Sequence, residues 1–199
     1  MVEIKVFNRW SSKDIVVEDK GLRAYINLDP KIVPRTGAKY AGQRFHKSNV
    51  FIVERLINRL MVPGHRGKKH KRSSGSCTGK GLTAYQIVEK ALEIIEKKTG
   101  KNPIAVLVKT IENCATREEI VTIEYGGARY PKAVECAPQR RVDLTLRYLS
   151  HGANDKSFKS KVPIEVALAE EIIAGFEINP KALAISKKKE LERQADSSR

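Results

Sequence analysis

The chain has 199 residues and carries 38 lysines and arginines against 23 aspartates and glutamates, a formal net charge of +15 at pH 7. A hydrophobic content of 41% can build a real core, so the composition excludes a chain that is disordered throughout. No apolar run approaches the roughly 18 residues of a membrane helix, no signal peptide is seen, and the scattered cysteines exclude a disulfide framework.

The charge predicts a nucleic-acid partner, because phosphates supply dense negative charge at regular spacing. An anionic membrane is the rival, but it calls for a basic amphipathic helix or a lipidation site, and the sequence shows neither. Added solubility alone is the remaining alternative. The few cysteines fit a reducing compartment, so we expect a cytoplasmic protein that makes no contact with a membrane.

Residues 1–49 carry ten lysines and arginines and five acidic residues without a sustained period. Val2–Phe7 alternates like a short strand, and prolines and glycines between residues 30 and 42 break any longer element. We expect a basic, partly irregular N-terminal extension that lies either on a partner or on a helical domain formed by residues 50–199.

The first predicted helix spans residues 50–62, where apolar side chains recur at helical spacing and Ser48 or Asn49 can cap the start. The following run, Gly64–Gly81, holds five glycines and six lysines and arginines but no acid. It lacks the side chains for a core, so we predict a loop or a disordered segment.

Two further helices follow in chain order. One starts at Leu82, with Thr83 and Gln86 as a possible capping box and Gly100 suited to the position just past its end. Asn102-Pro103 then opens the next helix, with asparagine as the cap and proline in the first turn, and its apolar stripe reaches Ala115.

The period then changes to two over residues 119–137, with a turn at Gly126-Gly127-Ala128, which predicts a β-hairpin. Pro131 confines its strand to an edge, so we expect the hairpin to project as a two-stranded arm. Such a ribbon is marginal alone in water, which suggests that its function lies outside the domain.

Helical spacing returns at Pro138–His151, with Gly152 as the stop, again at Pro163–Phe176, and in a last helix opened by Asn179-Pro180. The predicted fold class is mainly α, with about six helices and one protruding two-stranded β-hairpin arm.

The sequence gives little evidence for a nucleotide-binding, metal-binding or catalytic site. Gly75–Gly81 resembles a phosphate-binding loop, but its glycine spacing is one residue short and no strand precedes it. His65, His70 and Cys77 could form a metal trio, yet no close ligand pair exists, and Cys114 fits a small buried residue. No nucleophile pairs with a base, so we expect no enzyme, no cofactor and no metal.

Basic residues gather at the end of the hairpin and the start of the next helix: Arg129, Lys132, Arg140 and Arg141. Arginine at a helix N-terminus opposes the helix dipole, so Arg140-Arg141 call for a compensating anion. Backbone phosphate fits the guanidinium fork, and two solvated arginines are the alternative. Tyr130 can stack on an unpaired base or pack across the hairpin.

These residues carry a family resemblance. Gly126–Tyr130, Val134-Glu135, Pro138 and Arg140-Arg141 together resemble the hairpin-to-helix signature of the universal small-subunit ribosomal protein seven family. Further matching segments are Leu60-Met61 before the Gly/Lys loop, Ala84–Val88, Asn102-Pro103 with Val106–Val108, and the tail Ile185–Arg193, which resembles the archaeal and eukaryotic branch. The resemblance covers roughly residues 45–199.

The resemblance implies a helical domain with a hairpin arm in the head of the small ribosomal subunit. It implies binding to the 3′ major domain of the ribosomal RNA, a part in nucleating head assembly, and neighbouring ribosomal proteins of head and platform. The arm tip would face exit-site tRNA and mRNA through Gly126, Gly127, Ala128, Arg129, Tyr130 and Lys132.

The expected ribosomal RNA contacts are Arg35, Arg44, Lys47, Arg66, Lys68, Lys69, Lys71, Arg72, Lys80, Arg140, Arg141 and Arg147. Two positions depart from the family pattern. Gly79-Lys80-Gly81 stands where two lysines are usual, so we expect Gly67-Lys68-Lys69 to take their place. Ala133 replaces a common proline, which affects the stiffness of the hairpin.

Two other functions compete with this interpretation. The first is a DNA-compacting helical protein outside the ribosome, which would bind duplex DNA as tightly as structured ribosomal RNA. The second is an enzyme acting on RNA or nucleotide, which would need a base and nucleophile or metal ligands in one pocket.

Overall fold

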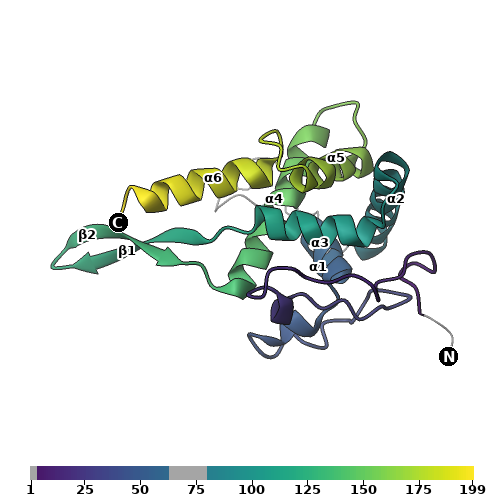
Figure 1. The fold of residues 1–199 in the computed structure, drawn as a ribbon, viewed down its shortest axis with the longest axis horizontal. Coiled ribbons are helices and arrows are strands. Elements are labelled where there is room, and N and C mark those ends of the chain that lie inside the picture. The colour runs from purple at the N-terminus through teal and green to yellow at the C-terminus, as the bar shows by residue number, and fades with distance from the viewer. Residues whose placement is uncertain (1–3, 63–79) are drawn as a thin grey trace.

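The computed structural model describes residues 4–62 and 80–199, which form a body of six helices with a two-stranded antiparallel hairpin projecting as an arm (Figure 1). This confirms the predicted fold class. The elements are α1 (Ile52–Leu60), α2 (Gly81–Thr99), α3 (Pro103–Cys114), β1 (Glu118–Tyr125), β2 (Ala128–Glu135), α4 (Pro138–Ser157), α5 (Ile164–Phe176) and α6 (Leu183–Asp196). None of the described helices combines the length and the apolar character needed to span a bilayer.

Helix α5 packs against four other helices, α2, α3, α4 and α6. Its Leu168 and Ile172 are fully buried with Leu107 of α3 and Leu149 of α4. Burying one such side chain is worth about 1.5–3 kcal/mol, so this cluster supplies much of the driving force for folding. The predicted apolar stripes are therefore the surfaces on which these helices meet.

Local signals decide some helix ends and not others. Asn102 caps α3, since its Oδ1 accepts the Ile104 N–H at 3.0 Å, and Gly100 ends α2 at φ 65°; both predictions are confirmed. The capping box at Thr83 is wrong, because α2 already begins at Gly81 without a side-chain cap. The cap predicted at Ser48 or Asn49 is also wrong, because α1 begins at Ile52 with Phe51 as its N-cap residue and no side-chain cap. The Ser48 hydroxyl instead accepts a hydrogen bond from Gln139.

Two ends near α5 depart from the prediction. Helix α4 does not stop at Gly152 but continues to Ser157. Gly152 faces Glu171 of α5, and a Cβ at residue 152 would lie 2.6 Å from the Glu171 Cδ. The glycine permits close helix packing there and does not act as a stop. Helix α6 begins at Leu183, because the Asn179 side chain accepts the Lys181 N–H and forms a turn first.

Glu171 is a buried carboxylate that ties three helices together. It is 1% exposed, its Oε1 lies 2.9 Å from Lys156 Nζ of α4, and its Oε2 accepts the Leu183 N–H of α6 at 3.0 Å. Burial raises the pKa of Glu171, and the Lys156 charge only partly opposes this. The folded state therefore binds the Glu171 proton more tightly than the unfolded state does.

This pKa shift predicts a pH dependence of stability. A raised folded-state pKa makes the free energy of unfolding fall as pH rises from about 4.5 through the folded pKa. Glu171→Gln should remove this slope, because an amide does not titrate in this pH range. Its amide oxygen can still accept the Leu183 N–H, so the contact with α6 is kept. The measurement is urea unfolding of both proteins between pH 4 and 7. A difference between them that does not change with pH would contradict the assignment.

The N-terminal segment packs on the helical body. Val6, Trp10 and Leu22 belong to the same buried cluster as the helices, and Glu112 of α3 accepts the backbone N–H groups of residues 18 and 19. The strand predicted at Val2–Phe7 is wrong for the described residues from Ile4 onward. Phe7 and Asn8 adopt left-handed φ values of 51° and 58°, so the chain turns back and Val6 bonds to Trp10.

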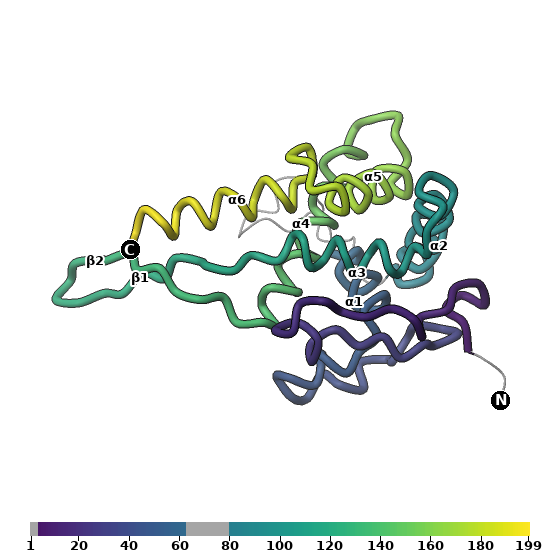
Figure 2. The backbone as a smooth tube through the Cα atoms, viewed as in Figure 1, coloured from purple at the N-terminus to yellow at the C-terminus, as the bar shows by residue number. Residues whose placement is uncertain are grey.

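The arm is a regular hairpin, with Tyr125 opposite Ala128 and a two-residue turn at Gly126 and Gly127. Both glycines have positive φ, 57° and 77°, which is the backbone that a tight hairpin turn requires. Figure 2 shows the turn at the far end of the arm, well away from the helical body. Tyr130 is exposed and lies opposite Ile123 across the strands.

Candidate nucleic-acid interface

A hollow of about 390 Å³ lies between α1, α4 and the segment before α1. Four of its lining residues are cationic, and Asp143 is its one acid. The cations are Lys47, Arg55, Arg59 and Arg147. An excess of three positive charges in one concave place attracts an anion, and the lining offers guanidinium forks suited to phosphate oxygens.

Asp143 is shared by two of these cations. Its Oδ1 accepts from Arg55 Nη2 at 3.0 Å, and its Oδ2 pairs with Lys47. Arg55 also donates to the Tyr25 carbonyl at 2.7 Å and is buried. Arg55 is therefore committed to holding the N-terminal segment, α1 and α4 together.

Arg59 and Arg147 have no such carboxylate of their own. No ion pair of either is found within residues 4–62 and 80–199, and the Arg59 Nε is buried without a hydrogen-bond partner. Burial lowers the pKa of Arg59 and the charge of Arg147 lowers it further, while the charge of Asp143 opposes them only in part. An oxyanion between the two side chains would relieve their repulsion and satisfy the orphaned donor.

Arg140 extends this surface toward the arm. Residues 140, 143 and 147 are spaced three and four apart, so they lie on one face of α4. The Arg140 Nε is 2.7 Å from Glu119 Oε1 at the arm base, yet about half of its side chain stays exposed. We call Lys47, Arg59, Arg140 and Arg147 the basic strip.

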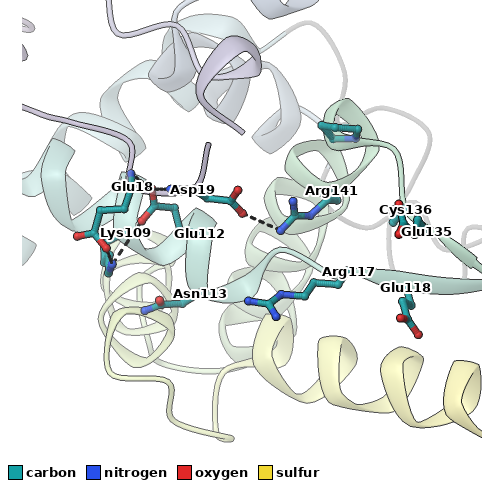
Figure 3. A pocket seen from close by; sticks show the side chains of 11 residues that line it. Glu18, Asp19, Lys109, Glu112, Asn113, Arg117, Glu118, Glu135, Cys136 and Arg141 are labelled. Carbon is teal, nitrogen blue, oxygen red and sulfur yellow. Dashed lines mark hydrogen bonds and ion pairs between the residues drawn. The ribbon is translucent and has the colours of Figure 1, made fainter. Parts of the chain in front are cut away.

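Arg141 points to the other side of α4. Its Nη2 is 2.9 Å from Asp19 Oδ2, and its side chain is 13% exposed (Figure 3). Burial raises the pKa of Asp19, but hydrogen bonds from Gly21 and Arg141 outweigh that effect and lower it overall. The anion that this helix start calls for is thus a carboxylate of the same chain, and Arg141 reaches a phosphate only if Asp19 releases it.

The hollow around Arg141 is larger, about 710 Å³, but its charges balance differently. Five carboxylates and three cations line it, and Lys109 already pairs with Glu18 and Glu112 (Figure 3). It therefore offers no excess of positive charge for a polynucleotide.

The other predicted contact residues are dispersed. Arg35 and Arg44 are exposed in the segment before α1, and Lys80 is exposed at the start of α2. The arm residues Gly126, Gly127, Ala128, Arg129, Tyr130 and Lys132 are all exposed. The loop residues Arg66, Lys68, Lys69, Lys71 and Arg72 lie outside the described residues.

Neither Arg55 nor Arg59 was predicted from the sequence. The apolar stripe dominates the pattern of residues 50–62, and the two arginines lie beside it, spaced four apart. The spacing of Arg55 and Arg59 on one helix face was the available signal.

Metal ligation and thiol chemistry find little support in the described residues. They contain no group of three His, Cys, Asp or Glu side chains placed to hold a metal, while His65, His70 and Cys77 lie outside them. Burial raises the pKa of Cys114 to about 12, and burial together with Glu119 raises that of Cys136 to about 11. Cys114 is buried, as predicted, and both groups are inert thiols at neutral pH.

The amino-acid sequence of the chain is similar to those of known proteins. A family model described as Ribosomal protein S7p/S5e matches residues 22–199. The small ribosomal subunit protein uS7 of Nanoarchaeum equitans (strain Kin4-M) is 52% identical over 198 residues, which cover 100% of both chains.

Proposed function

Because this chain belongs to the ribosomal protein S7p/S5e family, whose members are structural, non-enzymatic, RNA-binding components of the small ribosomal subunit, we propose that it binds the 3′ major domain of the ribosomal RNA. That domain forms the head of the subunit. Binding would order it and so help to nucleate head assembly in the cytoplasm. The protein acts by neutralising phosphate and by fitting the folded RNA, without bond chemistry.

The basic strip carries this proposal. Arg59 and Arg147 face one hollow with an unsatisfied donor between α1 and α4. Lys47 lines the same hollow, and Arg140 continues the charge along α4 toward the arm base. The RNA backbone supplies an anion that the chain itself does not provide there. Arg35, Arg44, Lys80 and the basic loop residues are secondary candidates for contact with the RNA.

The arm serves a second contact. Its tip, Gly126–Tyr130 with Lys132, is exposed and combines two cations with an exposed tyrosine, a combination suited to single-stranded nucleic acid. We assign this tip to exit-site tRNA and mRNA. Neighbouring head and platform proteins complete the proposed environment.

A salt titration tests the strip. Arg59→Ala with Arg147→Ala should flatten the slope of log K against log salt for a head-domain RNA transcript by about two units, one for each lost phosphate contact. Affinity should also fall across all salt concentrations. The measurement is filter binding or fluorescence anisotropy of the full chain from low to physiological salt.

The matched control removes the same charge elsewhere. Lys90→Ala with Lys97→Ala takes two exposed cations from α2, outside the strip, and should leave the slope unchanged. Equal slopes for the strip variant and the parent protein would remove Arg59 and Arg147 from the interface. Equal affinity of the parent for duplex DNA and for the transcript would favour the DNA-compacting alternative.

A further inference from the structure

The arm needs support that its own strands do not provide. A two-stranded ribbon is marginal in water, and residues 121–125 of β1 are exposed. The arm base also contains a repulsion, because Glu118 lies directly opposite Glu135 in the register. Like charges at facing positions destabilise a strand pair, so the base calls for a counter-charge.

Helix α6 lies along this base. It contacts both β1 and β2, and Figures 1 and 2 show its end beside the strands. Only residues 118–120 of β1, next to the body, are half-buried. The helix therefore covers the base of the arm and leaves the tip free.

Two residues of α6 and the residue at position 199 form hydrogen bonds with three places along the chain from the end of α3 to the start of β1. Lys188 Nζ donates to the Asn113 carbonyl at 2.8 Å, and Glu192 Oε1 accepts the Arg117 N–H at 3.1 Å. Beyond the helix, Arg199 Nη2 lies 2.5 and 2.6 Å from the two oxygens of Glu118.

These contacts come from one side of the helix. Positions 188, 192 and 195 are spaced four and three apart, so they share a face, and Ala195 on that face is fully buried. Burial lowers the pKa of Lys188, and the hydrogen bond with Glu118 raises that of Arg199. The buried Ala195 and the contacts of α6 with β1 and β2 show a helix seated against the arm base.

We propose that α6 is a brace that fixes the direction of the arm, with Glu192 and Arg199 as positioning residues that touch no RNA. Arg199 neutralises Glu118 and so relieves the Glu118–Glu135 repulsion. The functional value of a fixed arm rests on the proposed function, since a tip held in place loses less entropy when it meets nucleic acid.

Nuclear magnetic resonance of the full chain without RNA tests the brace. Arg199→Glu puts a further carboxylate beside Glu118 and Glu135, and also beside Asp196, which lies 3.6 Å from Arg199 Nη2. Backbone order parameters of the arm amides should then fall from about 0.85 to below about 0.6, while those of α3 and α5 stay unchanged. The unchanged values in the body show that the variant is folded.

A charge swap separates the brace from a general charge effect. Arg199→Glu combined with Glu118→Arg restores the pair and the net charge, so the arm order parameters should return to those of the parent. Arg193→Glu makes the same charge change on an exposed α6 position and should leave the arm ordered. An arm equally ordered in Arg199→Glu, or one that the swap fails to restore, would overturn the brace. Because RNA is absent, neither result depends on whether the proposed function holds.

Discussion

Leu22→Ala is expected to lower the free energy of unfolding of the helices by about 2–5 kcal/mol, the usual cost of truncating a buried leucine. Leu22 is 0% exposed, although residues 4–49 contain no α-helix and only two short 3-10 turns, Arg23–Tyr25 and His46–Asn49. The first of these turns contacts α4, and Leu22 belongs to the same core cluster as the helices. The cavity would therefore open in the shared core.

Circular dichroism at 222 nm during urea unfolding makes this a sharp measurement. The six α-helices that the structure describes lie within residues 52–196, so the signal reports on them and not on the segment that carries the mutation. A shift of their midpoint with an unchanged slope means that residues 4–49 and the helices unfold as one unit. We propose that the N-terminal extension and the helical domain form such a unit.

The control is Val16→Ala in the same segment. Val16 is 68% exposed, so the substitution should change the free energy of unfolding by less than about 0.5 kcal/mol. A helix midpoint that is the same for Leu22→Ala and for Val16→Ala would mean that the extension merely lies on a separately stable helical domain.

The sequence predicted the helical body well because its signals are local. The apolar period places α2, α3 and α5 within one or two residues of where they lie, and Asn102 and Gly100 mark ends through their own backbone chemistry. The ends near α5 depended on distant partners. The local pattern predicts that Gly152 ends its helix. The glycine is needed inside the helix because Glu171, nineteen positions along the chain, leaves no room for a Cβ there.

The buried residues of the N-terminal segment could not be predicted from the sequence, for a different reason. Val6, Trp10 and Leu22 are buried one at a time from turns, so no period marks them as core. These three residues are buried because they pack against the surface of the helices. A local sequence pattern carries no information about that surface.

The candidate site was predictable in composition but not in geometry. Charge near a helix start singled out Arg140 and Arg141, yet the two side chains reach different partners, Glu119 at the arm base and Asp19 in the N-terminal segment. Asp19, the partner of Arg141, lies 122 positions away in the sequence, so only the fold reveals that pairing. The orphaned donor of Arg59 likewise arises from the approach of α4 to α1.

Gly152→Ala is expected to destabilise the protein by about 2 kcal/mol, although the same change in an exposed helix stabilises by about 1 kcal/mol. The added methyl would meet three Glu171 atoms at 2.6–2.9 Å. Glu171 has little room to retreat, because its side chain is buried and pairs with Lys156 and the Leu183 N–H. A steric cost of about 3 kcal/mol thus outweighs the gain in helix propensity. Urea unfolding at pH 7 measures the difference.

A double-mutant cycle identifies the clash as the cause. In a Glu171→Ala background the carboxylate is gone, so Gly152→Ala should cost far less than it does in the parent, with a coupling of about 1–3 kcal/mol. Gly42→Ala is the matched control, because a methyl there meets nothing within 4 Å, and it should leave stability nearly unchanged. Additive losses in the cycle would mean that Gly152 is needed for a reason other than its approach to Glu171.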